Sequence, residues 1–201
     1  MIFIKKYQEK INKKNKLRLT NNDFSLITSN CTGGIVYHWL GLRFNSPFIN
    51  LFMSNEDYLN ALENFEKFIS TPLVEFESDN NYPIGIGYNG VMIHFMHYAS
   101  FDEANDKWEK RKKRINYDNL CVWLTNWNGE YKIIERFQNL PFKNKICFVN
   151  KKYNNCSNIV YLNCNKKKGG DGIGQIYRTK NIFGKRYLDD WDYVKFFNHM
   201  K

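Results

Sequence analysis

The residues best suited to do chemistry lie in one short segment, Phe24-Ser-Leu-Ile-Thr-Ser-Asn-Cys-Thr-Gly-Gly34. An apolar, β-branched run ends there in polar residues, a cysteine and two glycines, which predicts a strand that turns tightly into a helix. A helix N-terminus lowers the pKa of a nearby thiol and presents backbone N–H groups to an anion. We therefore expect Cys31 to act as a nucleophile, with Gly33 and Gly34 as oxyanion donors. The alternative is a buried cysteine in a structural turn.

A nucleophilic thiol needs a base, and three of the four histidines are considered for this role. His38 lies two helical turns further on, about 10 Å away along the helix axis. His94 and His97 lie in a predicted strand over residues 91–98, where their odd separation places them on opposite faces. We expect His97, nearer the carboxyl end, to be the base, with His94 as the second choice. For each histidine the alternative is a structural role.

Lysines and glycines are combined in a later segment, Lys166-Lys-Lys-Gly-Gly-Asp-Gly-Ile-Gly174. The segment lacks the GxxxxGK[ST] pattern of a P-loop. Its backbone is flexible, so we expect a lid in which Lys166, Lys167 and Lys168 contact the phosphate groups of a ligand.

An arginine falls on the apolar stripe of a predicted helix over residues 101–115. Phe101, Ala104, Trp108 and Ile115 form the stripe, and Arg111 lies among them. An arginine in this position pairs with a buried acid or with an oxyanion of a ligand. We expect a structural ion pair first and ligand binding second. The acidic start and basic end of this helix match its dipole, so nucleic-acid binding is not expected.

Two aspartates near the C-terminus, Asp190 and Asp192, have the D-x-D spacing that holds a divalent metal and a diphosphate in many sugar-nucleotide transferases. They also begin a predicted helix over residues 190–199, and acidic residues at a helix start cap the helix and stabilise it through its dipole. We expect capping, with a metal site as the alternative. The five cysteines lack paired CxxC spacing, which predicts reduced thiols and no zinc site.

The chain of 201 residues has a net charge of +10, and this charge is unevenly distributed. Residues 1–19 hold seven Lys or Arg and one Glu, and residues 143–186 hold eleven Lys or Arg and one Asp. Such blocks favour an anionic, phosphate-bearing ligand or an anionic membrane surface. The alternative is that lysines only keep an aromatic-rich surface in solution. Since no apolar run approaches the ~20 residues of a membrane span, we expect a cytoplasmic protein, with peripheral contact at the inner face of the membrane as an addition.

Helical and extended patterns mostly alternate, which predicts an α/β layered domain with a mixed, mostly parallel sheet flanked by helices. We expect a single domain over residues 1–201, with a basic helix in residues 1–19 as an appendage that packs on the domain itself. Ligands bind beyond the carboxyl ends of the strands in such folds. Asn30, Asn126 and Asn150 each follow a predicted strand, so their amides are expected at that edge. The predicted strands cover residues 24–29, 73–76, 84–88, 91–98, 120–125, 145–149 and 159–163.

Four motifs together resemble a known bacterial family. They are Ser29-Asn-Cys-Thr-Gly-Gly34, Leu42-Arg-Phe-Asn-Ser-Pro-Phe-Ile49, His94-Phe-Met-His-Tyr98 and Trp108-Glu-Lys-Arg-Lys-Lys-Arg-Ile-Asn116. They are similar to the "domain of unknown function 1919" family over about residues 24–186, and its members are often labelled exopolysaccharide biosynthesis proteins. Asn30 and Cys31 also resemble the Asn-Cys turn of capsule acetyltransferases, which implies an acyl-CoA donor.

These observations predict a group-transfer enzyme of exopolysaccharide or capsule biosynthesis, with acyl transfer to a sugar through Cys31. The expected partner is a sugar or polysaccharide precursor. One alternative is a glycosyltransferase that uses a sugar nucleotide and a divalent metal at Asp190 and Asp192. The other is a non-catalytic module that docks on an anion or a membrane.

Overall fold

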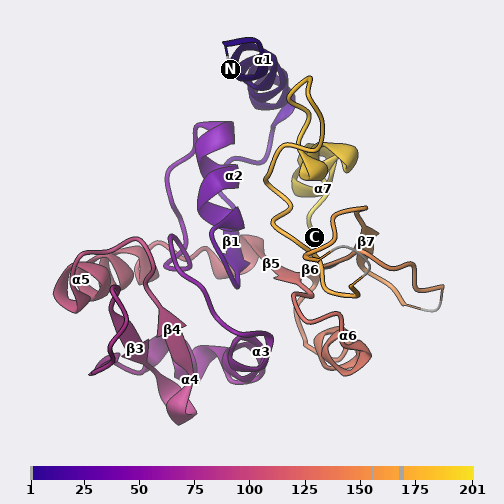
Figure 1. The fold of residues 1–201 in the computed structure, drawn as a ribbon. Coiled ribbons are helices and arrows are strands. Elements are labelled where there is room, and N and C mark those ends of the chain that lie inside the picture. The colour runs from indigo at the N-terminus through magenta and orange to yellow at the C-terminus, as the bar shows by residue number, and fades with distance from the viewer. Residues whose placement is uncertain (1, 155, 168–169) are drawn as a thin grey trace.

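The computed structural model describes residues 2–154, 156–167 and 170–201, in which helices surround a parallel sheet (Figure 1). The four strands of this sheet are all parallel and lie side by side in the order β1 (Ser25–Thr28), β5 (Leu120–Thr125), β6 (Asn144–Val149) and β7 (Ile159–Tyr161). The predicted α/β class is confirmed.

The predicted hairpin does not join the parallel sheet but forms a separate antiparallel one. Its strands are β2 (Val74–Phe76), β3 (Ile84–Ile86) and β4 (Met92–His94). The turn between β3 and β4 contains Asn89 at φ 59° and Gly90 at φ 76°, which is why an Asn-Gly pair suits it. Among the described strands the hairpin pairs only with β2, so the antiparallel strands lie in a sheet of their own beside the parallel one.

Seven helices are present in the described part of the chain, and most begin or end at residues that the sequence marks. Ser54 and Ser100 cap their helices by accepting hydrogen bonds from Asp57 N and Glu103 N, and Gly41 ends α2 at φ 67°. The helices are α1 (Ile2–Arg18), α2 (Thr32–Leu40), α3 (Asn55–Glu63), α4 (Phe65–Ser70), α5 (Phe101–Lys112), α6 (Tyr131–Gln138) and α7 (Tyr193–Asn198). The last predicted helix starts late, because Tyr187–Asp190 forms a 3₁₀ turn first.

The strands β1, β5 and β6 are buried on both faces, and successive residues of β1 and β5 alternate between two cores, whereas the edge strand β7 is only partly buried. On β5, Val122 and Leu124 belong to the core under α3, α5 and α6, whereas Cys121 and Trp123 belong to the core under α2 and α7. A strand buried on both faces reads as a continuous apolar run, as residues 120–124 do.

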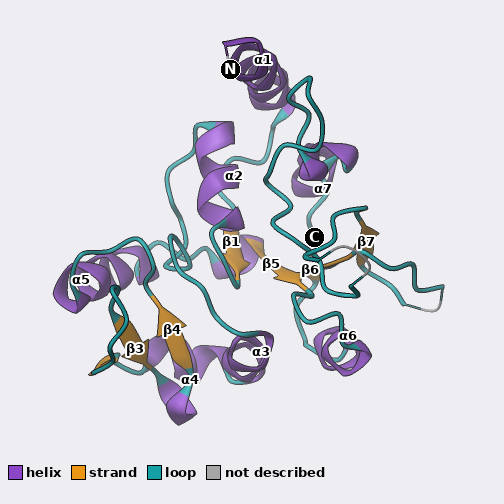
Figure 2. Cartoon of the chain, in the orientation of Figure 1, coloured by secondary structure: helices purple, strands orange, loops and turns teal. Residues whose placement is uncertain are grey.

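The basic N-terminal helix α1 lies at one end of the molecule, next to the C-terminal segment (Figure 1). Its inward face combines half-buried isoleucines with polar contacts: Asn15 Nδ2 donates to the Tyr193 hydroxyl at 2.9 Å, and Asn12 accepts from Arg186 Nη2 at 2.9 Å. The helix thus packs on its own chain, as the sequence favoured. Between β7 and the 3₁₀ turn at Tyr187–Asp190, the described residues form neither helix nor strand (Figure 2). Among the described helices, none has the length and apolar character needed to cross a membrane.

Candidate functional site

The carboxyl edge of the parallel sheet gathers the polar residues that follow its strands. Asn30 Nδ2 donates to Thr125 Oγ1 at 2.5 Å, which joins the ends of β1 and β5. Asn126 Nδ2 donates to the Glu130 carbonyl at 3.1 Å, and Asn150 Nδ2 donates to Asn165 Oδ1 at 3.0 Å. These amides lie at the carboxyl edge of the sheet, as expected. Their N–H groups donate to neighbouring segments of the chain and not into an open crevice.

Cys31 directly precedes α2, where the sequence places it, but its environment is not activating. The thiol is half-buried and lies 3.8 Å from the carbonyl oxygen of Leu51. Burial raises the pKa of the Cys31 thiol, and a backbone hydrogen bond offsets only part of this rise. The direction of the shift is therefore opposite to the expected lowering of the pKa, because burial is its largest cause.

The first N–H groups of α2 are already used within the protein. Thr32 N donates to Asn30 Oδ1 at 3.0 Å, and Gly33 N donates to Thr28 Oγ1 at 3.3 Å. Gly34 is buried against Ile49, whose Cγ2 would lie 3.1 Å from an added Cβ. In this structure the N–H of Gly33 is thus a capping group and not a free oxyanion donor, and Gly34 serves close packing.

The two candidate bases lie in different surroundings. β4 ends at His94, so His97 is outside the strand, in an exposed turn, and the argument from alternating faces does not hold. His94 is half-buried, and its backbone N–H and carbonyl both bond to Phe52, at 2.9 and 2.8 Å. Burial lowers the pKa of His94, and the charge of Asp57 opposes this only in part. The hydrogen-bond partner of the Cys31 thiol is the Leu51 carbonyl, not a histidine.

A line of half-buried rings, here called the aromatic row, crosses from the antiparallel sheet to the end of β5. The ring of His94 lies 5.9 Å from that of Tyr82 and 6.0 Å from that of Phe52. Phe52 lies 6.2 Å from Trp127, and Lys166 Nζ lies 4.4 Å from the Trp127 ring centroid. The sequence analysis missed this row, although Trp127 directly follows the predicted strand end and could have been included.

A cavity of about 400 Å³ adjoins the last ring of the row. Trp127, Lys166 and Arg178 line it, together with Gln175 and Tyr187. Two cations and an indole ring therefore face one open space at the carboxyl edge of the sheet, which is where α/β folds bind ligands.

The glycine-rich segment reaches the cavity by packing on the turn that carries Trp127. Ile173 N donates to the Asn126 carbonyl at 3.2 Å. At Gly172, an added Cβ would lie 2.2 Å from the Trp127 carbonyl oxygen, so only glycine fits there. Lys166 and Lys167 are exposed, whereas Lys168 lies outside the described residues.

Tyr177, which follows this segment, is half-buried. Burial raises the pKa of the Tyr177 hydroxyl, and the charge of a Cys31 thiolate would add to the rise. Sequence reasoning did not select Tyr177, because it is more than a hundred residues away from Cys31 along the chain.

Arg111 makes no ion pair with any residue that the structure describes, which corrects the expected pairing with an acid. Its Nη1 donates to the Tyr98 hydroxyl at 2.7 Å, and its guanidinium lies 5.3 Å from the ring centroid of Phe44. Tyr98 in turn donates to the Ile49 carbonyl at 3.2 Å. Arg111 therefore joins three of the motifs that carry the family resemblance, and its role here is structural.

The carboxylates of Asp190 and Asp192 are each paired with a cation. Asp190 contacts Lys180 and Lys185, and Asp192 contacts Arg18. Burial alone would raise the pKa of both carboxyls, but these cations lower it. Asp192 also caps α7 by accepting from Lys195 N at 3.1 Å, as expected, whereas Asp190 lies in the 3₁₀ turn before the helix. Among the described residues there is no group of three His, Cys, Asp or Glu side chains placed to hold a metal.

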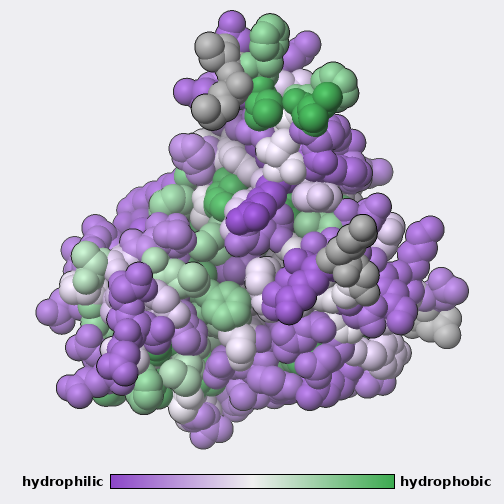
Figure 3. Space-filling view, viewed as in Figure 1, coloured by the Kyte–Doolittle hydropathy of each residue, from purple (hydrophilic) through white to green (hydrophobic). Residues whose placement is uncertain are grey.

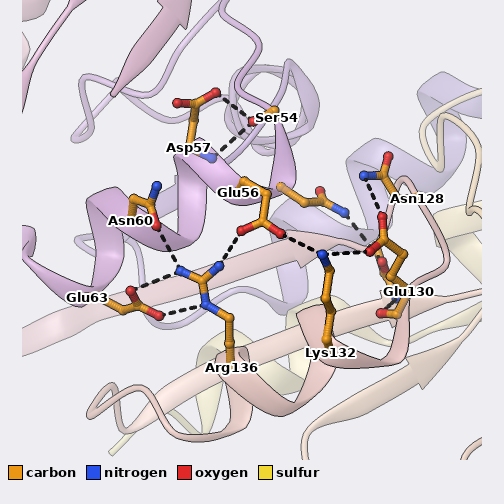
Figure 4. Close-up of polar contacts among 11 residues, drawn as sticks. Ser54, Glu56, Asp57, Asn60, Glu63, Asn128, Glu130, Lys132 and Arg136 are labelled. Carbon is orange, nitrogen blue, oxygen red and sulfur yellow. Dashed lines mark hydrogen bonds and ion pairs between the residues drawn. The ribbon is translucent and has the colours of Figure 1, made fainter. Parts of the chain in front are cut away.

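An ion network joins α6 to α3 and to the loop before α6 (Figure 4). Arg136 of α6 contacts Glu56 and donates from Nε to Glu63 at 3.0 Å, both on α3. Lys132 bridges Glu56 and Glu130 at 3.3 and 3.2 Å. The network therefore holds α6 against α3 and supports the loop before α6.

The fold and the edge cavity define an α/β protein with a parallel sheet and a cavity lined by cationic and aromatic side chains at its carboxyl edge. A family model described as "Domain of unknown function (DUF1919)" matches residues 3–198. The chain belongs to this family. It is 39% identical over 190 residues to an uncharacterized protein of Haemophilus influenzae, and the match covers 94% of this chain and 91% of that protein. The resemblance seen in the motifs is thus confirmed at the level of the family, and it extends to α1 and α7.

Proposed function

We propose that this protein binds a phosphate-bearing sugar at the carboxyl edge of its parallel sheet and takes part in transferring a group to or from it. The observation that carries the proposal is the aromatic row ending at Trp127, beside a cavity with Lys166 and Arg178. The family resemblance suggests surface-polysaccharide assembly as the setting.

The two kinds of side chain at this edge suit the two parts of such a ligand. Half-buried aromatic rings offer apolar faces to the C–H face of a sugar ring, with a small loss of side-chain entropy. Arginine and lysine bind phosphate oxygens through charge-assisted hydrogen bonds, and arginine does so in a bidentate manner. Trp127, Lys166 and Arg178 are the residues that would make these contacts.

Within this proposal Cys31 is the candidate nucleophile and His94 the candidate base. The lowered pKa of His94 keeps its ring neutral at pH 7, as a general base requires. The raised pKa of Cys31 keeps its thiol protonated in the free protein, so a base must remove the proton. An acyl-CoA thioester is the donor that the Asn-Cys turn suggests.

The proposal is tested by thermal shift and calorimetry with UDP-glucose, UDP and acetyl-CoA as probes. A ligand that binds only the folded state raises the melting temperature. We expect UDP-glucose to raise it, and Trp127→Ala or Arg178→Ala to weaken binding about tenfold or more, the worth of one stacked ring or charged contact.

Matched control variants lie at the opposite edge of the sheet. Tyr117→Ala removes an exposed ring, and Lys143→Ala removes an exposed cation, in a separate cavity near the N-terminal ends of the strands. They should leave binding unchanged. The proposal fails if none of the three probes binds, or if the control variants weaken binding as much as the site variants do. A response to acetyl-CoA alone would favour acyl transfer.

A further inference from the structure

A second surface combines exposed apolar side chains with lysines that make no ion pair among the described residues. It consists of the outer face of α1 and the loop over residues 181–184. Figure 3 shows hydrophobic side chains gathered at this end of the molecule. Phe3 is 89% exposed and Leu17 is 79% exposed, and in the loop Ile182 is 83% exposed and Phe183 72%. We call this surface the docking face.

The apolar loop of the docking face is held in place by specific contacts. Asn181 Oδ1 accepts from Phe183 N at 3.1 Å and from Lys185 N at 3.2 Å. Gly184, at φ 97°, lies so close to α1 that an added Cβ would be 3.1 Å from Ile4 Cα. Gln8 Nε2 of α1 donates to the Gly184 carbonyl at 2.9 Å. The loop is therefore held against the first turns of α1.

The outer face of α1 carries its lysines and its exposed apolar residues together. Positions 3, 6, 10, 13 and 17 follow helical spacing, so Phe3 and Leu17 share a face with Lys6, Lys10 and Lys13. Within residues 2–154, 156–167 and 170–201, none of these lysines has an acidic partner, and Arg18 makes the one ion pair found on α1. The opposite face of the helix is used for packing on the chain itself.

We infer that the docking face binds the surface of an anionic lipid bilayer. Apolar side chains that are more than two-thirds exposed gain free energy by entering the interfacial region, and lysines beside them gain by contacting lipid phosphates. A second copy of the chain fits this face poorly, since it would oppose lysines to lysines. A nucleic acid would offer phosphates to the lysines, but it would leave the side chains of Ile182 and Phe183 exposed to water. The inference does not rest on the proposed sugar-phosphate site.

The test is co-sedimentation with vesicles of phosphatidylcholine, with and without phosphatidylglycerol, at physiological salt. The wild-type protein should bind the anionic vesicles and not the neutral ones. Phe3→Ser, Ile182→Ser and Phe183→Ser together, or Lys6→Glu, Lys10→Glu and Lys13→Glu together, should each weaken binding about tenfold or more. Circular dichroism and melting temperature establish that the variants fold.

Each set has a matched control elsewhere on the molecule. Val74→Ser, Phe76→Ser and Met96→Ser remove three other exposed apolar side chains, and Lys107→Glu, Lys113→Glu and Lys143→Glu make the same change of charge. Both controls should bind as the wild type does. The inference is overturned if the wild type ignores anionic vesicles or if the controls lose binding equally. Two other results would also overturn it. One is that the wild type self-associates and the apolar variants lose this self-association without losing vesicle binding. The other is that the wild type binds DNA, and that the apolar variants bind DNA equally well and vesicles no worse.

Discussion

Cys31 shows how burial and position act in opposite directions on one side chain. The start of α2 offers a dipole that stabilises a thiolate, but the half-buried sulfur lies against the Leu51 carbonyl, which an anion would repel. The neighbouring N–H groups are taken by Asn30 and Thr28. The net result is a pKa above that of an ordinary cysteine, and hence a thiol that is protonated at neutral pH.

This state of Cys31 predicts slow alkylation at neutral pH. The thiolate is the reactive form, so a raised pKa leaves less of it at pH 7 than free cysteine has. We expect iodoacetamide to modify Cys31 several-fold more slowly than free cysteine at pH 7, and the rate to climb as the pH rises toward the raised pKa. Peptide mass mapping separates Cys31 from Cys156, which is also half-buried. Alkylation of Cys31 faster than that of free cysteine would contradict the burial argument.

At the scale of elements, the helices and loops around β5 hold the candidate site in place from both sides. The α3–α6 ion network supports the turn before α6, and the glycine-rich segment packs on the same turn through Gly172. The motifs around Phe44, Tyr98 and Arg111 join α5 to the loop after α2. Residues of the family motifs therefore serve largely to pack the fold. The residues of the aromatic row, in contrast, do not all belong to any one motif.

The ion network gives a prediction about stability. Arg136 is about one-third exposed and pairs with two glutamates, so Arg136→Ala should lower the free energy of unfolding by about 1 kcal/mol, with a smaller effect in high salt. Urea unfolding at low and high salt measures this change. As a control, Lys110→Ala removes an isolated, exposed pair with Asp106 on α5 and should change stability less than Arg136→Ala does. An equal loss in both variants would show that the network adds nothing.

At the scale of the whole molecule, the two ends of the chain are held together by charged and polar contacts. Arg18 of α1 meets Asp192 at the start of α7, and Asp190 holds Lys180 and Lys185. These contacts fix the position of α1 and of the loop over residues 181–184. The docking face therefore depends on carboxylates that remain ionised.

The lowered pKa values of Asp190 and Asp192 predict an acid-sensitive contribution to stability. A carboxyl whose pKa is lower in the folded than in the unfolded state stabilises the fold above the unfolded value of 3.8, and loses this effect as the pH falls through the folded pKa. We expect the melting temperature to fall below about pH 4, and to fall less steeply in Asp190→Asn. Thermal unfolding from pH 7 to pH 3 checks this, and identical slopes in the two proteins would exclude Asp190 as a cause.

The sequence by itself determined the local structure and the family of this protein. Apolar runs marked β1, β5 and β6, serine caps marked α3 and α5, and an Asn-Gly pair marked the β3–β4 turn, because each depends on neighbouring residues only. The tertiary structure alone decided that the hairpin forms its own sheet and that Cys31 is desolvated. It also decided that Phe52, Tyr82, His94 and Trp127 align. Burial and contacts between distant segments arise only when the chain packs, so the spacing of residues along it does not reveal them.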